Sequence, residues 1–415
     1  TAIGKFPHRN KPISIQSSLT EKSTLNYQSI AEQLMLLNLS IYTPINYVLK
    51  SKVNLYAEKY DQKVKSSTFS QADREKSLQI LMRINLLKRI ESSIDSFRIT
   101  VGGILNQVNN YLTLIEKNAE GIIDVGLESE DDIDDMDLDN DWGDEENIIG
   151  KKIKIRISDI DKTRWKEDLI ADKEALEALL NQTGNVSTGG DKKLSLLKKL
   201  ISEKIEHPLN PGNKKVIVFT AFADTANYLY EALSKWMLEH YQLHTAIITG
   251  SKCKSTASHI HADLNTLLTC FSPISKGKEL SFPNIKEQID LLIGTDCISE
   301  GQNLQDCDYL INYDIHWNPV RIIQRFGRID RIGSKNESIT LVNFWPDVSL
   351  DAYINLKQKV ESKMLITNLT STGDDNILNS EEKDLEYRKA QLKRLQEEVI
   401  DLEDLREGVS ITDLG

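Results

Sequence analysis

Short apolar runs alternate with helical segments along the chain from about Lys214 onward. An apolar run, a helix and a further apolar run, repeated several times, are typical of a parallel sheet with crossover helices. We therefore predict an α/β region in this part of the chain. Its expected strands are Val216–Phe219, Ala246–Ile248, Asp290–Gly294, Tyr309–Tyr313 and Ile339–Phe344, and its expected helices are Ala223–His240, Ser255–Phe271 and Val320–Ile332.

Apolar residues at spacings of three and four dominate the chain from Leu19 to about Asn118, which predicts a mainly helical region before the sheet. One long helix is expected from Gln71, with an apolar stripe that runs to Phe97. Basic residues lie off that stripe and are expected on a solvated face. They are Arg74, Arg83, Lys88, Arg89 and Arg98.

Composition divides the chain into three expected regions. Residues 1–207 form a helical linker region with an acidic insert near 124–149, residues 208–370 form the sheet region, and residues 371–415 form a helical extension. Twelve acidic residues and no basic one lie between Glu128 and Glu146. Such a block repels itself, so we expect a disordered or solvated insertion rather than a mimic of nucleic acid. Without it the formal net charge of −12 becomes zero, and a local basic groove is compatible with the rest.

Several protein classes are excluded by what the sequence lacks. No apolar run reaches the roughly 20 residues needed to cross a bilayer, and Thr1–Pro12 lack the charged start and apolar block of a signal peptide, so we expect a cytoplasmic protein with no membrane partner. The cysteines fit neither a zinc ribbon nor a disulfide framework, and His259 and His261 have no evident further ligand, so no metal site is expected. Because the first residue is Thr rather than Met, we expect a piece of a longer protein.

Two segments that follow predicted strands carry the candidate chemistry, since functional loops sit at the carboxyl ends of parallel strands. Gly294–Leu304 is a loop-to-helix turn whose hydroxyl groups suit phosphate oxygens. On one helix, Gln324, Arg328 and Arg331 at i, i+4 and i+7 would share a face. Two guanidinium groups there suit a transferring phosphoryl group. The alternative is a basic surface helix with ion pairs to Asp330 or the acidic block, and spacing alone leaves both open.

The motifs resemble those of one family. The string QRFGRIDRIGS, which begins at Gln324, resembles motif VI of superfamily 2 helicases, and GTDCISEGQNL, which begins at Gly294, is similar to their motif V. VIVFTAF at Val216–Phe222 is similar to their motif at the first strand of lobe two. The WNP that ends at Pro319 and the R-I-G that begins at Arg331 resemble the Swi/Snf-type ATPases, including the bacterial RNA-polymerase-associated ATPase group.

The resemblance covers about Lys214–Phe344, and it extends upstream with less specific signals. Lys5-Phe6-Pro7 looks like the segment that leaves lobe one, and Met82–Arg98 is similar to the helical insertion before lobe two in bacterial members. Arg325 stands where eukaryotic remodellers have a small residue, which agrees better with bacterial relatives, and Ser334 replaces their usual Gln.

The resemblance implies a fold and roles for individual residues. The fold is a RecA-like parallel sheet with flanking helices, the helicase C-terminal lobe, preceded by a mainly helical domain. Arg328 and Arg331 would be arginine fingers, and Gln324 would contact the terminal phosphate or the attacking water. Glu300 and Gly301 would lie at the nucleotide and lobe interface. Thr295, Asp296 and Ser299 would face the nucleic-acid backbone or couple it to the nucleotide, and Trp317 and Asn318 would support the motif helix.

The phosphate-binding half of a nucleotide site is missing from the motifs. No G-x-x-x-x-G-K-[ST] occurs in the 415 residues, and Asp144–Asn147 lacks the apolar strand that a magnesium-binding D-E-x-x box requires. We therefore expect the C-terminal portion of an ATP-dependent nucleic-acid translocase or helicase, inactive alone and using ATP and Mg²⁺ in its parent protein.

The expected partners are double-stranded DNA, with RNA as the alternative, the missing N-terminal RecA-like lobe, and a further protein. A non-catalytic regulatory or protein-binding module derived from a helicase lobe is the competing hypothesis. A dinucleotide-binding or glycosyltransferase-like sheet is disfavoured because no G-x-G-x-x-G follows the first strand.

Overall fold

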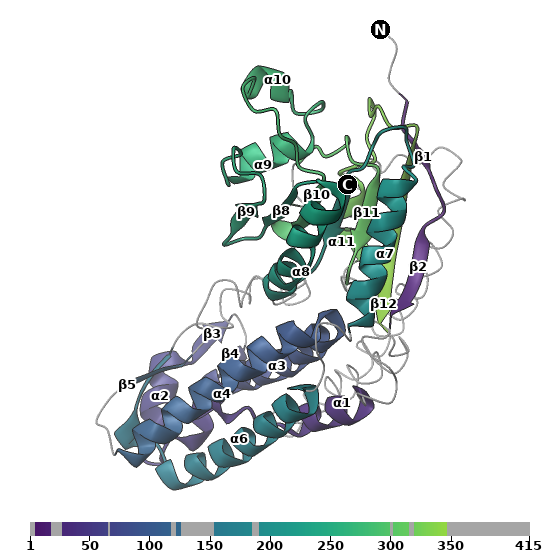
Figure 1. Ribbon diagram of the computed structural model, residues 1–415. Coiled ribbons are helices and arrows are strands. Elements are labelled where there is room, and N and C mark those ends of the chain that lie inside the picture. The colour runs from purple at the N-terminus through teal and green to yellow at the C-terminus, as the bar shows by residue number, and fades with distance from the viewer. Residues whose placement is uncertain are drawn as a thin grey trace, which may run out of the picture. The chain divides into compact units, whose positions relative to one another are not determined.

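The computed structural model describes eight stretches of the chain, which form two compact units (Figure 1). The described residues are 5–17, 27–64, 67–117, 122–125, 153–184, 191–298, 302–314 and 319–346. Among them, residues 5–17 and those from Lys192 onward belong to one unit, which we call the sheet unit. Those from Tyr27 to Asp191 belong to the other, the helical unit.

The described part of the sheet unit contains an eight-stranded sheet in the order β1-β12-β11-β7-β10-β8-β9, with β2 also paired to β12. Its strands are β1 (His8–Arg9), β2 (Ile13–Ser17), β7 (Val216–Phe219), β8 (Thr245–Ile248), β9 (Cys253–Ser255), β10 (Leu291–Gly294), β11 (Tyr309–Asn312) and β12 (Ser338–Pro346). All these pairs are parallel except that of β8 with β9, which is antiparallel. The five predicted strands are confirmed.

Helices cover both faces of this sheet. They are α7 (Lys192–Glu206), α8 (Ala223–Tyr241), α9 (Leu264–Phe271) and α11 (Pro319–Phe326), and the described unit also contains the short α10 (Lys278–Ser281) and η6 (Asp296–Ile298). Alternate residues of β7 show the two faces, because successive side chains of a strand point in opposite directions. Val216 and Val218 pack with α7 and α8, whereas Ile217 and Phe219 pack with residues of α9 and α11. A central strand buried on both sides reads as a continuous apolar run, and the predicted α/β class is confirmed.

The start of the chain differs from its prediction. Residues 1–207 were expected to form a helical linker region, yet β1 and β2 run parallel to β12, with Arg9 opposite Ile339 and Ile15 opposite Phe344. The alternation of Ile13 and Ile15 with polar neighbours is a strand pattern. The structure also places the boundary between the units at Asp191 and Lys192, so α7 belongs with the sheet.

The helical unit consists mainly of long helices. Its helices are α1 (Tyr27–Leu36), α2 (Val53–Tyr60), α3 (Gln71–Ser92), α4 (Ile94–Glu116) and α6 (Lys162–Gly184), with the shorter η1 (Ser40–Tyr42), η2 (Pro44–Tyr47) and η4 (Ile157–Asp159). Its described residues also form two antiparallel strand pairs, β3 (Gln62–Val64) with β4 (Ser67–Phe69) and β5 (Ile122–Val125) with β6 (Ile153–Arg156).

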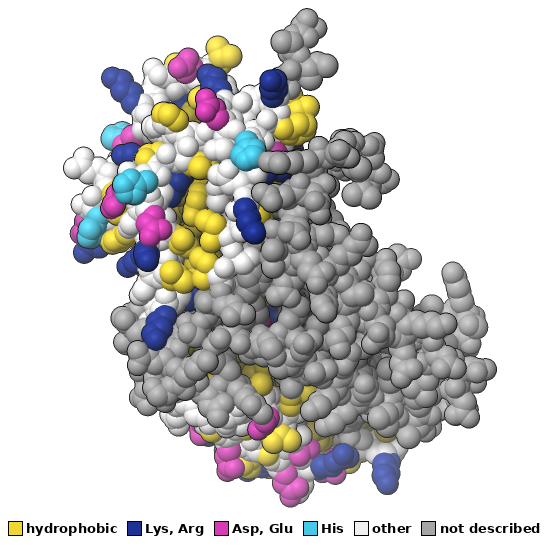
Figure 2. All heavy atoms as spheres, turned by 90° about the vertical axis from the view of Figure 1, so that its right-hand side faces the viewer, with side chains coloured by type: hydrophobic (Ala, Val, Ile, Leu, Met, Phe, Trp, Pro, Cys, Tyr) yellow, Lys and Arg dark blue, Asp and Glu magenta, His cyan; other side chains and the backbone are white. Residues whose placement is uncertain are grey.

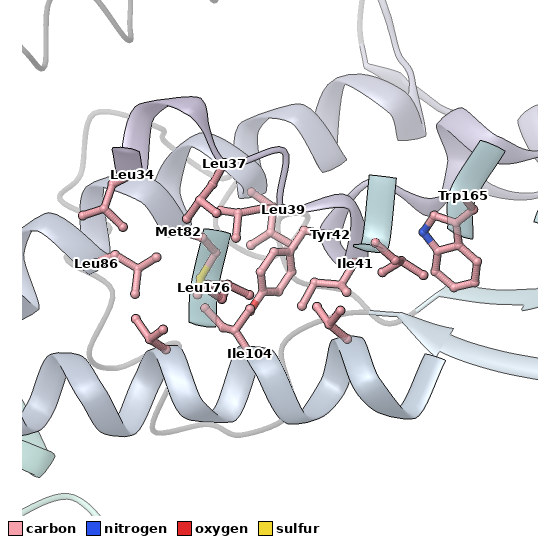
Figure 3. Close-up of a cluster of buried hydrophobic side chains, with 14 of the residues drawn as sticks. Leu34, Leu37, Leu39, Ile41, Tyr42, Met82, Leu86, Ile104, Trp165 and Leu176 are labelled. Atoms are coloured by element: carbon pink, nitrogen blue, oxygen red, sulfur yellow. The ribbon is translucent and has the colours of Figure 1, made fainter. Parts of the chain in front are cut away.

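The core of the helical unit surrounds a sharp turn between α1 and η1 (Figure 3). Side chains converge there from four of the helices and from the turn, among them Leu34, Leu37, Leu39, Met82, Leu86, Ile104 and Leu176. Leu39 has a φ of 49°, and the Asp172 carboxylate accepts hydrogen bonds from the amides of Leu39 and Ser40 at 2.9 and 2.7 Å. The Trp165 indole donates to the Ser40 carbonyl at 3.2 Å. Buried polar contacts thus hold a turn that apolar packing alone would not specify.

Two predictions for the segment after Gln71 are wrong. The expected single helix is broken at Ser93, whose extended backbone and side-chain oxygen cap α4. The basic residues do not all face solvent, because Arg74 and Arg89 are buried. The Arg89 guanidinium donates to the Asn85 side chain at 2.8 Å, a partner one helical turn away that makes its burial tolerable.

The helix expected at Ser255–Phe271 is shorter than predicted. α9 begins at Leu264, because the Asp263 side chain caps it by accepting from the Thr266 amide at 3.0 Å. His259 and His261 precede the helix and are exposed, and each contacts a different carboxylate, of Glu287 and Asp263 respectively. The acidic block and the expected helical extension lie outside the described residues.

Candidate functional site

The candidate site is built at the carboxyl ends of three neighbouring strands, β7, β10 and β11. The loops that follow these strands are held together by main-chain bonds. The Thr220 amide donates to the Gly294 carbonyl at 3.1 Å, and the Tyr313 amide donates to the Phe219 carbonyl at 2.8 Å. The segments that the motifs singled out therefore share one edge of the sheet, where ligands bind in open α/β folds.

The loop after β7 is fixed by the loop after β11. The Asp314 carboxylate accepts from the Thr220 hydroxyl at 2.5 Å and from the Ala221 amide at 2.7 Å. Asp314 is buried, and two donors compensate its charge for the loss of water. Both hydrogen bonds orient the entrance to α8.

A fully buried guanidinium joins the motif V-like segment to the motif VI-like helix. Arg325 Nε and Nη2 donate to the two oxygens of Asp296 at 2.6 and 2.7 Å, and Nη1 donates to the Asn312 side chain at 3.0 Å. Its guanidinium carbon also lies 5.2 Å from the ring centroid of Phe219. Fork-to-fork pairing of arginine with a carboxylate fixes the orientation of both groups. Arg325 thus sets how α11 meets the strand ends.

The turn after β10 leaves no room for a side chain on its glycine. A Cβ on Gly294 would overlap the side chain of Ile298 and lie 3.2 Å from the Ile248 carbonyl oxygen. Ile298 is fully buried. Any larger residue at this position requires the Ile298 side chain to shift, and η6 carries Asp296 toward Arg325.

Thr295, which was expected to contact a nucleic-acid backbone, is buried at the start of this turn. Its amide donates to the Ile248 carbonyl at 3.2 Å, and its hydroxyl donates to the Cys297 sulfur at 3.3 Å. Thr295 is thus held by its neighbours.

The expected helical ladder of Gln324, Arg328 and Arg331 does not form, because α11 ends at Phe326. We call the segment Gly327–Gly333 that follows it the arginine turn. Its first amides bond in a tighter pattern, with Arg328 donating to the Arg325 carbonyl at 3.1 Å and Ile329 to that of Phe326 at 3.0 Å. The Arg328 carbonyl then accepts from the Leu304 amide at 3.0 Å, a tertiary contact that spacing cannot reveal.

The three side chains differ in exposure and contacts. Gln324 is exposed on α11, whereas Arg328 and Arg331 are half-buried in the arginine turn. Arg331 Nε donates to the Gly327 carbonyl at 3.2 Å, and its Nη1 donates to the Asn303 side chain. Asn303 belongs to the motif V-like string, so both motifs meet at the arginine turn.

Several expected positions lie outside the described residues. They are Ser299, Glu300, Gly301, Trp317 and Asn318. Sequence reasoning in turn missed the positioning roles of Thr220, Asn312 and Asp314, and gave Arg325 no role. Each of the first three lies at the end of a predicted strand, and this position could have marked them as candidates. Their contacts with one another across strands could not be predicted from the sequence.

The described surface of the sheet unit is mixed in charge. On the face that Figure 2 shows, lysine and arginine are interspersed with acidic and histidine side chains around a band of hydrophobic groups. Among the described residues no three His, Cys, Asp or Glu side chains lie together as a metal site would require. None of the helices in the described ranges is both long and apolar enough to cross a membrane.

The sheet unit is similar in sequence to known proteins. Residues 192–333 match the family model of the helicase conserved C-terminal domain. The sheet unit has the fold of a helicase C-terminal lobe. The "Uncharacterized ATP-dependent helicase YqhH" of Bacillus subtilis (strain 168) is 31% identical over 124 residues, which are 30% of this chain and 17% of that protein.

A second protein and one solved structure are also similar to this chain. The "Probable ATP-dependent RNA helicase ddx51" of Dictyostelium discoideum is 28% identical over 190 residues, 46% of this chain and 30% of that protein. The chain thus spans less than a third of either relative. The crystal structure of the C-terminal part of the Fun30 ATPase domain matches 87% of this chain and 89% of its own at 15% identity, with a TM-score of 0.35.

Proposed function

We propose that this chain is the C-terminal portion of an ATP-dependent translocase of superfamily 2 and of the Swi/Snf type, which moves along double-stranded DNA. The observation that carries the proposal is the pairing of Arg325 with Asp296, which locks the motif V-like and motif VI-like segments together at the carboxyl edge of the sheet. The match to helicase C-terminal domains over residues 192–333 supports it.

In this proposal Arg328 and Arg331 act on an ATP whose phosphates and Mg²⁺ are held by another RecA-like lobe. The charge that develops on the transferring phosphoryl oxygens is neutralised by guanidinium groups, which contribute about 10³–10⁵-fold in related enzymes. Gln324, exposed beside the arginine turn, would contact the terminal phosphate or the attacking water. Glu300 and Gly301 would face the nucleotide across the interface between lobes.

Nucleic-acid contacts are proposed for the loop after β10. Ser299 would face the phosphate backbone, whereas the buried Thr295, whose hydroxyl donates to the Cys297 sulfur, would support the turn. Asp296 would act differently, since its carboxylate is engaged by Arg325 and its charge would repel a phosphate. We assign Asp296 the role of transmitting movements of this loop to α11.

The test uses the longer protein that contains the phosphate-binding lobe. We expect ATP hydrolysis that duplex DNA stimulates, and a loss of about 10³-fold in kcat for Arg328→Ala and for Arg331→Ala. Lys335→Ala is the matched control, because Lys335 is an exposed cation close to Arg331 in sequence. Thermal unfolding of each variant checks that the fold is retained. Unchanged hydrolysis in both arginine variants would contradict the proposal.

The same assay separates the remaining alternatives. Stimulation by RNA and not by DNA would identify RNA as the nucleic acid on which the protein moves, and the proposal of an ATP-dependent translocase would stand. Absence of hydrolysis with the second lobe present would favour a regulatory module that binds a protein partner through this lobe.

A further inference from the structure

Asp330 is a buried carboxylate inside the arginine turn. It lies between the two proposed fingers in sequence, its side chain is 1% exposed, and its amide donates to the Phe326 carbonyl at 3.1 Å. A carboxylate shielded from water is costly unless a cation compensates it. The position of the turn therefore depends on what Asp330 meets.

Arg9 supplies that cation from the far end of the chain. Its Nη2 lies 2.8 Å from Asp330 Oδ2, and its side chain is only 25% exposed. β1 holds Arg9 in place, because the His8 amide donates to the Glu337 carbonyl at 2.8 Å and the Asn10 amide donates to the Ile339 carbonyl at 2.9 Å. The Phe6 ring lies 6.0 Å from the guanidinium carbon.

We propose that Arg9 is a positioning residue for the arginine turn and acts through its ion pair with Asp330. The expected effect on ATP hydrolysis rests on the proposed function. The expected effect on the position of the arginine turn rests on geometry alone. Without Arg9 the carboxylate would have to reach solvent or take up a proton, and either change alters the backbone that carries Arg328 and Arg331. Residues 5–17, which precede the helical unit in the chain, thereby influence the positions of Arg328 and Arg331.

The pKa of Asp330 also depends on its ion pair with Arg9. Burial raises the pKa of Asp330, and the Arg9 charge opposes that shift. An ionised carboxylate in this position thus relies on the arginine, which a lysine replaces only as a point charge. Arg9→Lys is accordingly expected to restore part of what Arg9→Met removes.

The first test needs no activity and uses the 415-residue chain itself. In Arg9→Met we expect hydrogen exchange at the amides of Arg328, Ile329 and Asp330 to rise about tenfold, because the turn opens more often. Asn10→Ala is the control. It removes the 3.1 Å bond from Asn10 Nδ2 to the Thr340 hydroxyl and loosens β1 without touching the ion pair. Equal exchange in both variants would overturn the proposal.

The second test measures catalysis in the longer protein. Arg9→Met and Asp330→Asn are each expected to lower kcat about tenfold with little change in the KM for ATP, and the double variant is expected to be no worse than either. Additive losses would overturn the coupling.

The two tests keep two failures apart. If Arg328→Ala leaves hydrolysis unchanged, the proposed function fails while the exchange result still decides the positioning role. If Arg328→Ala abolishes hydrolysis and Arg9→Met changes neither exchange nor kcat, only the present inference fails.

Discussion

Buried charges with specific partners occur in both units. In the sheet unit Arg325 meets Asp296, and Lys204 meets Asp308 at 2.8 Å with almost no exposure of either side chain. In the helical unit the Asp172 carboxylate accepts instead from the amides of Leu39 and Ser40 and from the Ser40 hydroxyl. Because desolvation offsets most of the attraction, such groups contribute orientation more than stability. Charged side chains therefore mark the places where this fold fixes a geometry.

Glu75 makes the helical unit sensitive to pH. Burial raises the pKa of Glu75 from 4.5 to about 8, although the Ile45 amide donates to its carboxylate at 2.9 Å. Between these two values the folded state retains a proton that the unfolded state has released. The free energy of unfolding of this unit should therefore fall as pH rises from about 4.5 to about 8, by at most about 1.4 kcal/mol per pH unit.

Chemical denaturation at several pH values checks this expectation. Glu75→Gln should flatten the pH dependence and make the unit more stable than the wild type near pH 8. Glu177→Gln, at a glutamate whose side chain is 48% exposed, serves as the control and should leave the slope unchanged. A wild-type slope that persists in Glu75→Gln would assign the effect to another group.

At the scale of elements, the ends of helices and strands position the site more than their interiors do. α11 stops at Phe326 and releases the arginine turn, and β10 stops at Gly294 and releases η6. The arginine turn is held by a distant contact, from the Leu304 amide to the Arg328 carbonyl, whereas the turn after β10 is packed locally by the Ile298 side chain of η6.

Gly294→Ala tests the junction between β10 and η6. The added methyl group overlaps the buried Ile298 side chain, so we expect a loss of about 1–3 kcal/mol in the stability of the sheet unit. Gly102→Ala gives the opposite sign, because no atom lies within 4 Å of its added Cβ in α4 and alanine favours a helix by about 1 kcal/mol. Thermal unfolding measures both. A neutral Gly294→Ala would show that η6 can shift without cost.

For the whole molecule, the sheet unit is discontinuous in sequence. Residues 5–17 pair with β12, although the helical unit lies between them and β7 in the chain. β2 matches β12 over five residues, from Ile13 with Val342 to Ser17 with Pro346. β12, a strand of nine residues, is thereby covered by two shorter strands, and short edge strands are less prone to pair with other chains.

Deletion of residues 1–17 tests whether β1 and β2 protect β12. Without β1 and β2 we expect faster hydrogen exchange at β12 and concentration-dependent association, because an unpaired edge invites further strands. Deletion of residues 1–4 is the control, since it leaves both strands intact. Unchanged exchange at β12 in the larger deletion would show that these strands do not protect the edge.

The sequence by itself determined the class of the sheet unit and the identity of its chemical groups. β7, β10 and β11 are apolar runs whose burial on both faces leaves no other reading, and the motif strings name Gln324, Arg328 and Arg331. Periodicity also predicted a mainly helical region and the start of α3 at Gln71, but not the break at Ser93. These features are local, because side-chain spacing along one segment encodes them.

Only the tertiary structure decided which distant groups meet. The partners of Arg325, the end of α11, the burial of Arg74 and Arg89, and the addition of β1 and β2 to the sheet all depend on contacts between segments far apart in the chain. The energy of a buried charge depends on which partner the fold brings to it, and no local pattern contains that information.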